Sequence, residues 1–288
     1  MTKNPGSNPA TIADVVNAEN KTYQRSPDGT MTFWGHLEEL RGHLIRSSLA
    51  ILVCAIAAFL AKDILFSNVI LAPKEPYFLT NRVFCWFSEQ LSMPVLCINK
   101  NPVKLINIDL AGQFTTHIVV SLIIGIIAAI PYIVFEIWRF IRPGLNPKEQ
   151  ANSRGAVLVI SGLFLTGVLF AYFLIVPLSI NFLGSYQVSA LVENQIALRS
   201  FITTVTTITL ATGLLFELPV FVYFLSKVGI VTPEAMRKQR KLAFVIIIAV
   251  AALITPPDVF SQIMVGMPLF VLYEISIRIS KRVAPKPV

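Results

Sequence analysis

Residues 116–138 read THIVVSLIIGIIAAIPYIVFEIW, an apolar run whose only charged side chain is Glu136. Crossing a hydrocarbon core of about 30 Å takes about 20 helical residues, so this run is long enough to span a bilayer. It lacks the strict apolar–polar alternation that a barrel strand needs. The run therefore predicts a transmembrane α-helix.

The rest of the chain repeats this pattern. Three more runs of spanning length lie at 44–66, 156–177 and 203–225. A pair of shorter runs, 242–254 and 259–277, is joined by a Pro-Pro turn, and the first of them is too short for a bilayer of normal thickness. We expect this pair to form a short helical hairpin beside a thinned membrane, with a single re-entrant loop as the alternative.

Composition supports a membrane protein. The 288-residue chain is 55% hydrophobic and 14% charged, with a mean hydropathy of +0.68, which excludes an ordinary soluble domain. If the N-terminus is cytoplasmic, six spans place eighteen of the 24 Lys and Arg residues on the inside. The sequence therefore predicts an all-α protein with six transmembrane helices and both termini in the cytoplasm. The net charge of +8 then follows from topology and requires no nucleic-acid partner.

Two tails and a long outer loop lie outside these spans. Residues 1–30 are polar and lack an apolar run, so we expect a disordered cytoplasmic tail rather than a signal peptide, followed by a membrane domain at 31–281 and a short tail at 282–288. The outer loop at about 67–113 contains Cys85 and Cys97, which form either a disulfide or two free thiols.

Catalytic and metal-binding motifs are not found in the sequence. It contains no Gly-rich phosphate loop, no His-Glu-x-x-His and no Gly-x-Ser-x-Gly. The three histidines, His36, His43 and His117, fall on different elements without a Cys or acidic partner at ligand spacing. We expect neither an enzyme nor a bound metal or cofactor.

The first of four polar motifs is FWGHLEELR at 33–41, just before the first span. Its apolar residues recur at helical spacing, which predicts a stripe on the membrane surface that holds Glu38, Glu39 and Arg41 at headgroup level. Two interpretations are open: a solvated turn with a local Glu–Arg pair, or carboxylates that accept a guanidinium from a partner.

The second motif covers residues 131–149. Pro131 can bend the second span, and Pro143 begins a turn after it. Glu149 fits the third position of the next helix, so it is either a capping carboxylate or a binding residue.

The third motif is Glu217, which lies near mid-bilayer on one helix face with Thr206, Thr209 and Gly213. Either this glutamate is neutral and hydrogen-bonded to a neighbouring span, or the polar face meets a partner helix, an ion or a transported segment.

The fourth motif, TPPDVFSQ at 255–262, predicts a structural turn in which Asp258 sits at capping spacing from Thr255. Gln262, one turn inside the following helix, is a candidate exposed contact.

These motifs, HLEELR at 36–41, the 131–149 run, FELP at 216–219 and TPPDVFSQ at 255–262, resemble in order and spacing those of TatC, the multi-span receptor subunit of the twin-arginine protein translocase. The resemblance covers about residues 31–281. It implies a glove-shaped bundle of six helices in the cytoplasmic (inner) membrane, with short fifth and sixth helices. It also implies export of folded proteins, driven by the proton-motive force, with single-span TatA and TatB partners in a self-associating complex.

The resemblance also assigns roles to residues. It implies that Glu39 and Glu149 recognise the paired arginines of a signal peptide, with Arg41 and Phe140 nearby. It places Glu217 on the concave face, where Thr209 and Gln262 are further candidates for contact with a partner. Pro73 matches a proline at the end of the first span. The long outer loop with its cysteines departs from many relatives.

Two rival functions come from other classes. A proton-coupled solute transporter could use Glu217 as its carrier site, but the sequence shows no pair of related halves. An intramembrane hydrolase would need an acid pair, or a nucleophile with a base, at membrane depth, and Glu217 has no such partner in the sequence pattern.

Overall fold

The computed structural model describes residues 33–93, 97–99, 103–142, 153–189, 194–255 and 259–284. The expectations for the tail at 1–30 and for Pro143, Glu149 and Asp258 lie outside these residues.

The described chain is almost entirely helical. Its first half contains α2 (Phe33–Leu60), α3 (Lys62–Ile64), the π-helix η1 (Leu65–Ile70), the 3₁₀ turn η2 (Ala72–Lys74), α4 (Leu79–Gln90), β1 (Leu105–Ile106) and α5 (Gly112–Ile141). Its second half contains α7 (Ser153–Phe170), the π-helix η5 (Ala171–Ile175), α8 (Val176–Ser185), β2 (Ile196–Ala197), α9 (Leu198–Leu215), α10 (Leu218–Lys227), α11 (Pro233–Lys238), α12 (Arg240–Ile254) and α13 (Val259–Val283).

Helices long and apolar enough to cross a membrane occur five times in the described part of the chain, at Gly35–Leu60, Gly112–Ile141, Gly155–Ser185, Leu198–Lys227 and Ser261–Val283. Each overlaps one of the predicted spans. The remaining predicted span corresponds to α12, which has 15 residues and is shorter than a bilayer requires. A total of six spans therefore stays a prediction.

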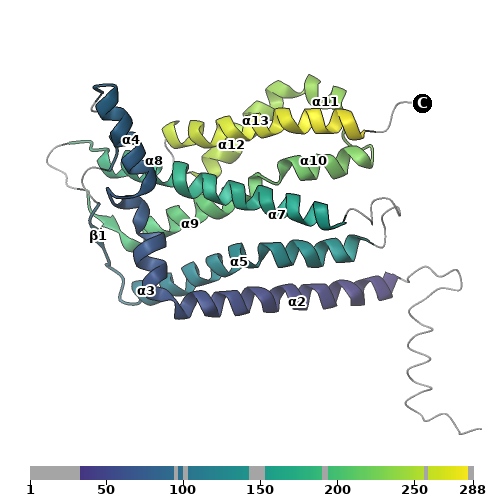
Figure 1. The fold of residues 1–288 in the computed structure, drawn as a ribbon, viewed down its shortest axis with the longest axis horizontal. Coiled ribbons are helices and arrows are strands. Elements are labelled where there is room, and N and C mark those ends of the chain that lie inside the picture. The colour runs from purple at the N-terminus through teal and green to yellow at the C-terminus, as the bar shows by residue number, and fades with distance from the viewer. Residues whose placement is uncertain are drawn as a thin grey trace, which may run out of the picture.

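The long helices run side by side (Figure 1). We call the end where α2 begins and α5 ends the Glu39 end, and the end that bears α4, β1 and β2 the α4 end. Helix α13 also finishes at the Glu39 end, so the first and last described helices start and stop on the same side (Figure 1).

Helix α2 corrects the expected surface helix at 33–41. That motif continues without a break into the first span, in one helix of 28 residues. Such a helix is about 42 Å long against about 30 Å of hydrocarbon, so its first turns project beyond the apolar core instead of lying flat on it.

The fourth span is broken where the sequence predicts a continuous helix. Helix α9 ends at Leu215 and α10 begins at Leu218, with Phe216 and Glu217 in a turn between them. Pro219 explains the position, because a proline ring clashes with the carbonyl four residues earlier, here that of Leu215. Phe216 is buried and packs over Gly167 of α7, where any Cβ would lie 2.7 Å from its ring.

The core lies where α5, α7, η5 and α9 meet, and its fully buried members include Val120, Ala171, Ile175, Ile202 and Ile208. Helix α13 joins this core through the buried Val265 and Leu269. Two buried serine pairs, Ser179–Ser261 and Ser226–Ser280, also join it to α8 and α10, each 2.8 Å between hydroxyl oxygens.

The α4 end contains structure that the sequence does not predict. β1 and β2 pair in parallel, with Leu105 opposite Ile196, and a two-residue ladder has no detectable period. Cys85 and Cys97 are joined in a disulfide, which is the first of the two alternatives. Pro73 is buried in η2, and its carbonyl accepts a hydrogen bond from Asn81.

The hairpin of α12 and α13 corrects one expectation. Thr255 is buried, and its hydroxyl donates back to the carbonyl of Ala251 in α12 at 2.9 Å, whereas its predicted capping relation to Asp258 lies outside the described residues. Gln262 is half-buried instead of exposed, because its amide donates to the Ile248 carbonyl at 3.0 Å and ties the two helices together.

Candidate functional site

The first turns of α2 carry two glutamates in different surroundings. Glu38 lies 3.8 Å from the guanidinium of Arg41, and both side chains are largely exposed. Glu39 is half-buried and has no ion-pair or hydrogen-bond partner among the described residues. The local Glu–Arg pair is therefore made by Glu38, which leaves the Glu39 carboxylate available to a partner.

Phe140 brings the end of α5 against the start of α2. Its ring stacks on His36, with centroids 4.4 Å apart and planes at 25°, and the ring of His43 meets it from the side at 5.9 Å. Since His36 lies one turn before Glu39, this stack places the Glu39 turn beside the point where α5 leads into the segment that contains Glu149.

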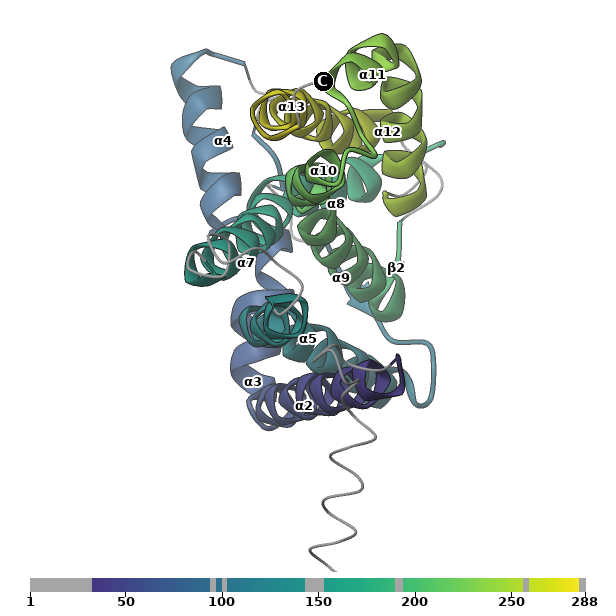
Figure 2. The same ribbon diagram turned by 90° about the vertical axis from the view of Figure 1, so that its right-hand side faces the viewer.

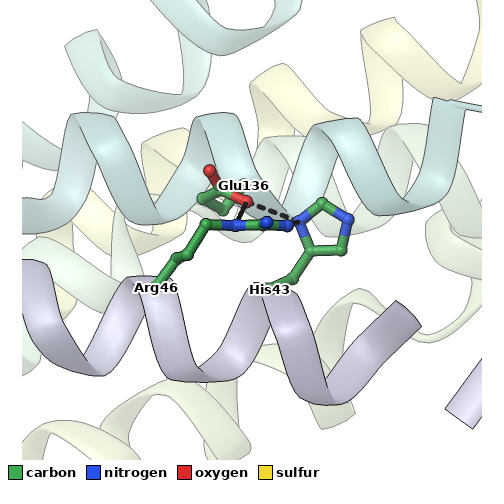
Figure 3. Close-up of polar contacts among 3 residues, drawn as sticks. All are labelled: His43, Arg46 and Glu136. Atoms are coloured by element: carbon green, nitrogen blue, oxygen red, sulfur yellow. Dashed lines mark hydrogen bonds and ion pairs between the residues drawn. The ribbon is translucent and has the colours of Figure 1, made fainter. Parts of the chain in front are cut away.

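Below this stack, α2 and α5 share a buried ionic cluster, His43, Arg46 and Glu136 (Figure 3). The Oε2 of Glu136 lies 2.5 Å from His43 Nδ1 and accepts a hydrogen bond from Arg46 Nε at 3.1 Å. The side chains of Glu136 and His43 are 2% and 7% exposed, whereas that of Arg46 is 46% exposed.

The cluster geometry indicates that Nδ1 of His43 carries a proton. Its Nδ1 also lies 3.1 Å from Nη2 of Arg46, which can only donate. A ring nitrogen carries either a proton, through which it donates, or a lone pair, through which it accepts. Nδ1 therefore cannot both donate to the carboxylate and accept from the guanidinium. Because the shared oxygen is anionic and closest, we assign the Nδ1 proton to the bond with Glu136.

This cluster was missed by reasoning from the sequence, although Glu136 lies in the run at 116–138. A carboxylate two residues before Trp138 in an apolar helix indicates a polar partner on another helix, because such groups are rarely buried without one. Its partners lie 93 and 90 residues earlier, so they become visible only when α2 and α5 pack together.

The predicted polar face of the fourth span lies inside the protein. Thr206, Thr209 and Thr212 are buried, and the hydroxyls of Thr206 and Thr209 donate to carbonyls one turn earlier in α9, each at 2.7 Å. Gly213 packs against Phe164 and Val168 of α7. The face is therefore buried within this chain, with Gly213 against α7, and its contact with a partner helix, an ion or a transported segment stays a prediction.

Glu217 sits at the end of this face, in the break between α9 and α10. It is 9% exposed, and neither carboxylate oxygen has a hydrogen-bond partner of good geometry among the residues that the structure describes, although the backbone of Phe164 lies close to it. A buried polar group without a partner loses its hydration and gains nothing in exchange, so this residue costs stability.

We therefore expect Glu217→Met to raise the thermal unfolding temperature of the purified protein, by the equivalent of about 1 kcal/mol or more. Glu217→Gln is the matched control, because it keeps a buried polar group and should gain less. The measurement is thermal unfolding in detergent followed by circular dichroism. A lower unfolding temperature in the Met variant would show that the carboxyl has a stabilising partner.

Among the described residues, no group of three or more His, Cys, Asp and Glu side chains is arranged to hold a metal ion. At the Glu39 end the described residues include the half-buried Glu39 carboxylate, the His36–Phe140 stack and the half-exposed guanidinium of Arg46.

The fold and the site together define a multi-span α-helical membrane protein with a half-buried carboxylate and an aromatic stack at one end of its bundle. The family model for Sec-independent protein translocase protein (TatC) matches residues 35–268. The chain belongs to the TatC family, and it is a component of a twin-arginine protein translocase.

Similar proteins cover nearly the whole chain. The Sec-independent protein translocase protein TatC of Blattabacterium sp. subsp. Periplaneta americana (strain BPLAN) is 35% identical over 258 residues, which is 89% of this chain and 97% of that protein. The corresponding TatCy of Bacillus subtilis (strain 168) is 32% identical over 251 residues, with coverage of 87% and 89%.

Solved structures agree with these relatives. A crystal structure of the twin arginine translocase receptor TatC in DDM has a TM-score of 0.67 at 33% identity, covering 84% of this chain and 98% of that one. A second crystal structure of this receptor gives a TM-score of 0.63 at 33% identity, with coverage of 86% and 99%. The alternative of a solute transporter that uses Glu217 is not favoured by these similarities.

Proposed function

We propose that this chain is the receptor of the translocase, and that it binds twin-arginine signal peptides of folded precursor proteins at the Glu39 end. The observation that carries the proposal is the position of Glu39 beside the His36–Phe140 stack. The Glu39 carboxylate has no ion-pair or hydrogen-bond partner among the described residues. Two guanidinium groups require two separate carboxylates, and Glu149, carried over from the family motif, supplies the second.

The charge distribution supports the direction of binding. The excess of Lys and Arg in the segments at the Glu39 end supports the proposal that this is the cytoplasmic side of the inner membrane, with both termini in the cytoplasm. A precursor arriving from the cytoplasm would then meet the carboxylates at the depth where water is depleted but still present.

The other parts of the proposal concern assembly. The chain acts as a non-enzymatic receptor that recruits single-span TatA and TatB partners and associates with further copies of itself, and the proton-motive force supplies the energy. Since Thr209 is buried and Gln262 is half-buried here, a partner helix would reach these residues only after α9 or the α12–α13 hairpin moves.

The test is binding of a fluorescent leader peptide to the purified full chain. We expect Glu39→Gln and Glu149→Gln each to weaken binding of a twin-arginine leader by roughly tenfold, because each removes one charge-assisted pair. The double variant should bind twin-arginine and twin-lysine leaders equally weakly.

Glu38→Gln is the matched control, because Glu38 is adjacent, exposed and already paired with Arg41. It should leave binding of the twin-arginine leader unchanged. Undiminished binding in the double variant, or an equal loss in the Glu38 variant, would remove the proposed docking site.

A further inference from the structure

Helix α4 reverses the arrangement usual in soluble proteins, where the side of a helix that faces the protein is apolar and the outer side is polar. Its protein-facing residues are polar: Thr80, Asn81 and Ser88 are buried. Thr80 donates to the Phe173 carbonyl, Asn81 to the Pro73 and Glu75 carbonyls, and Ser88 to the Met93 carbonyl. Hydrogen bonds therefore hold much of the side that packs on the bundle, together with the buried Phe78 ring at the start of the helix.

The outward side of α4 is apolar. Leu79, Val83, Trp86 and Phe87 are 61%, 42%, 55% and 48% exposed. They stand at positions i, i+4, i+7 and i+8, so they form one stripe along the helix, which we call the α4 stripe. Arg82 and Glu89, both exposed, lie together along one edge of it.

The orientation of the α4 stripe is fixed by the fold. The Cys85–Cys97 disulfide ties the helix to the segment of Ile98 and Asn99, which are 5% exposed. Asn99 in turn bonds to Asn81 of α4 and to the carbonyl of Pro177 in α8, both at 3.1 Å. The helix cannot roll to bury its apolar side without breaking these contacts.

The position of α4 places the stripe at the boundary of the membrane. The helix crosses the direction of the long helices at one end of the bundle (Figure 1), and in the view along the spans it is seen side-on and extends away from them (Figure 2). Phe78 at its start stacks on Phe173, one turn after Leu169, which is 54% exposed on α7. Exposed apolar side chains therefore occur both on α4 and on the end of α7 that leads to Phe173.

We propose that α4 is an interfacial helix that binds the lipid surface, with the α4 stripe among the acyl chains and Arg82 and Glu89 among the headgroups. Tryptophan and arginine suit this depth, since each combines an apolar body with a polar end. An open hollow of about 500 Å³ on α4, with Leu79, Val83 and Trp86 on its wall and Arg82 at its rim, has the composition to take an acyl chain below a lipid phosphate.

The test uses Trp86 as its own reporter in the full chain, reconstituted in vesicles of phosphatidylcholine and phosphatidylglycerol. With Trp34 and Trp138 replaced by Phe, we expect Trp86 emission to be quenched by phosphatidylcholine brominated near the acyl carbonyl and protected from aqueous iodide. The emission should also shift to shorter wavelength relative to free tryptophan.

A matched variant in this background carries Trp86→Phe and Glu89→Trp, which moves the reporter to the polar edge of the same helix. The expected order of quenching reverses, with iodide more effective than bromolipid. If the background variant is unstable, the difference between wild type and Trp86→Phe gives the same signal. Quenching of Trp86 by iodide alone would mean a solvated face, and protection from both quenchers would mean a protein partner; either result overturns the proposal.

Discussion

Replacing Gly125 by valine is expected to prevent stable packing of α2 against α5. A Cβ at Gly125 would lie 2.7 Å from the backbone nitrogen of Ala55 and 2.8 Å from its Cα, so the two helix backbones would have to separate. Overpacking against side chains costs about 1–3 kcal/mol, and we expect about 3 kcal/mol or more here because the obstacle is backbone. Membrane accumulation and the thermal unfolding temperature should both fall sharply.

Gly162→Val is the matched control for this prediction. Gly162 lies in α7, another long helix, and a Cβ there meets no atom within 4 Å. The same β-branched residue is therefore added without a clash, and the unfolding temperature should change little. Equal losses in the two variants would show that helix propensity, and not the contact with Ala55, controls the effect.

The helices of the bundle could be predicted from the sequence because hydrocarbon thickness fixes their length. The break in the fourth span could not, even though Pro219 is visible. Pro131 lies inside α5 and Pro268 inside α13, and both helices continue through their prolines. What differs at Pro219 is the packing of Phe216 over Gly167, which stabilises a turn there and depends on contacts between distant segments.

The candidate site, like the fold, could be predicted from the sequence only in part. The Glu39 motif has a local signature, since its apolar spacing and charges lie within one short segment. The burial of Thr206 and Thr209 against the α7 side could not be predicted, because periodicity identifies a polar face but does not say which helix covers it. For Glu136, the sequence shows a carboxylate inside a span but not the histidine and arginine that neutralise it.

The second large effect is expected from Glu136→Leu. This change leaves the buried His43 without its partner for Nδ1 and removes the acceptor of Arg46. Leaving the buried His43 without its hydrogen-bond partner costs about 1–3 kcal/mol, to which the loss of packing at Glu136 adds, whereas Arg46 can turn its half-exposed guanidinium to water. We expect a large fall in the thermal unfolding temperature in detergent. Since His43 also contacts Phe140, binding of a twin-arginine leader should weaken.

A second change separates the ionic effect from a simple loss of volume. Glu136→Leu combined with His43→Leu removes both buried polar partners, so the double variant should regain much of the lost stability. Glu136→Gln keeps an acceptor for Arg46 and should cost less than Glu136→Leu. Glu38→Leu, which breaks an exposed pair with Arg41, should cost less than about 1 kcal/mol. Additive losses in the Glu136 and His43 double variant would mean that the two side chains act independently, and the cluster would then not be what holds the start of α2 against the end of α5.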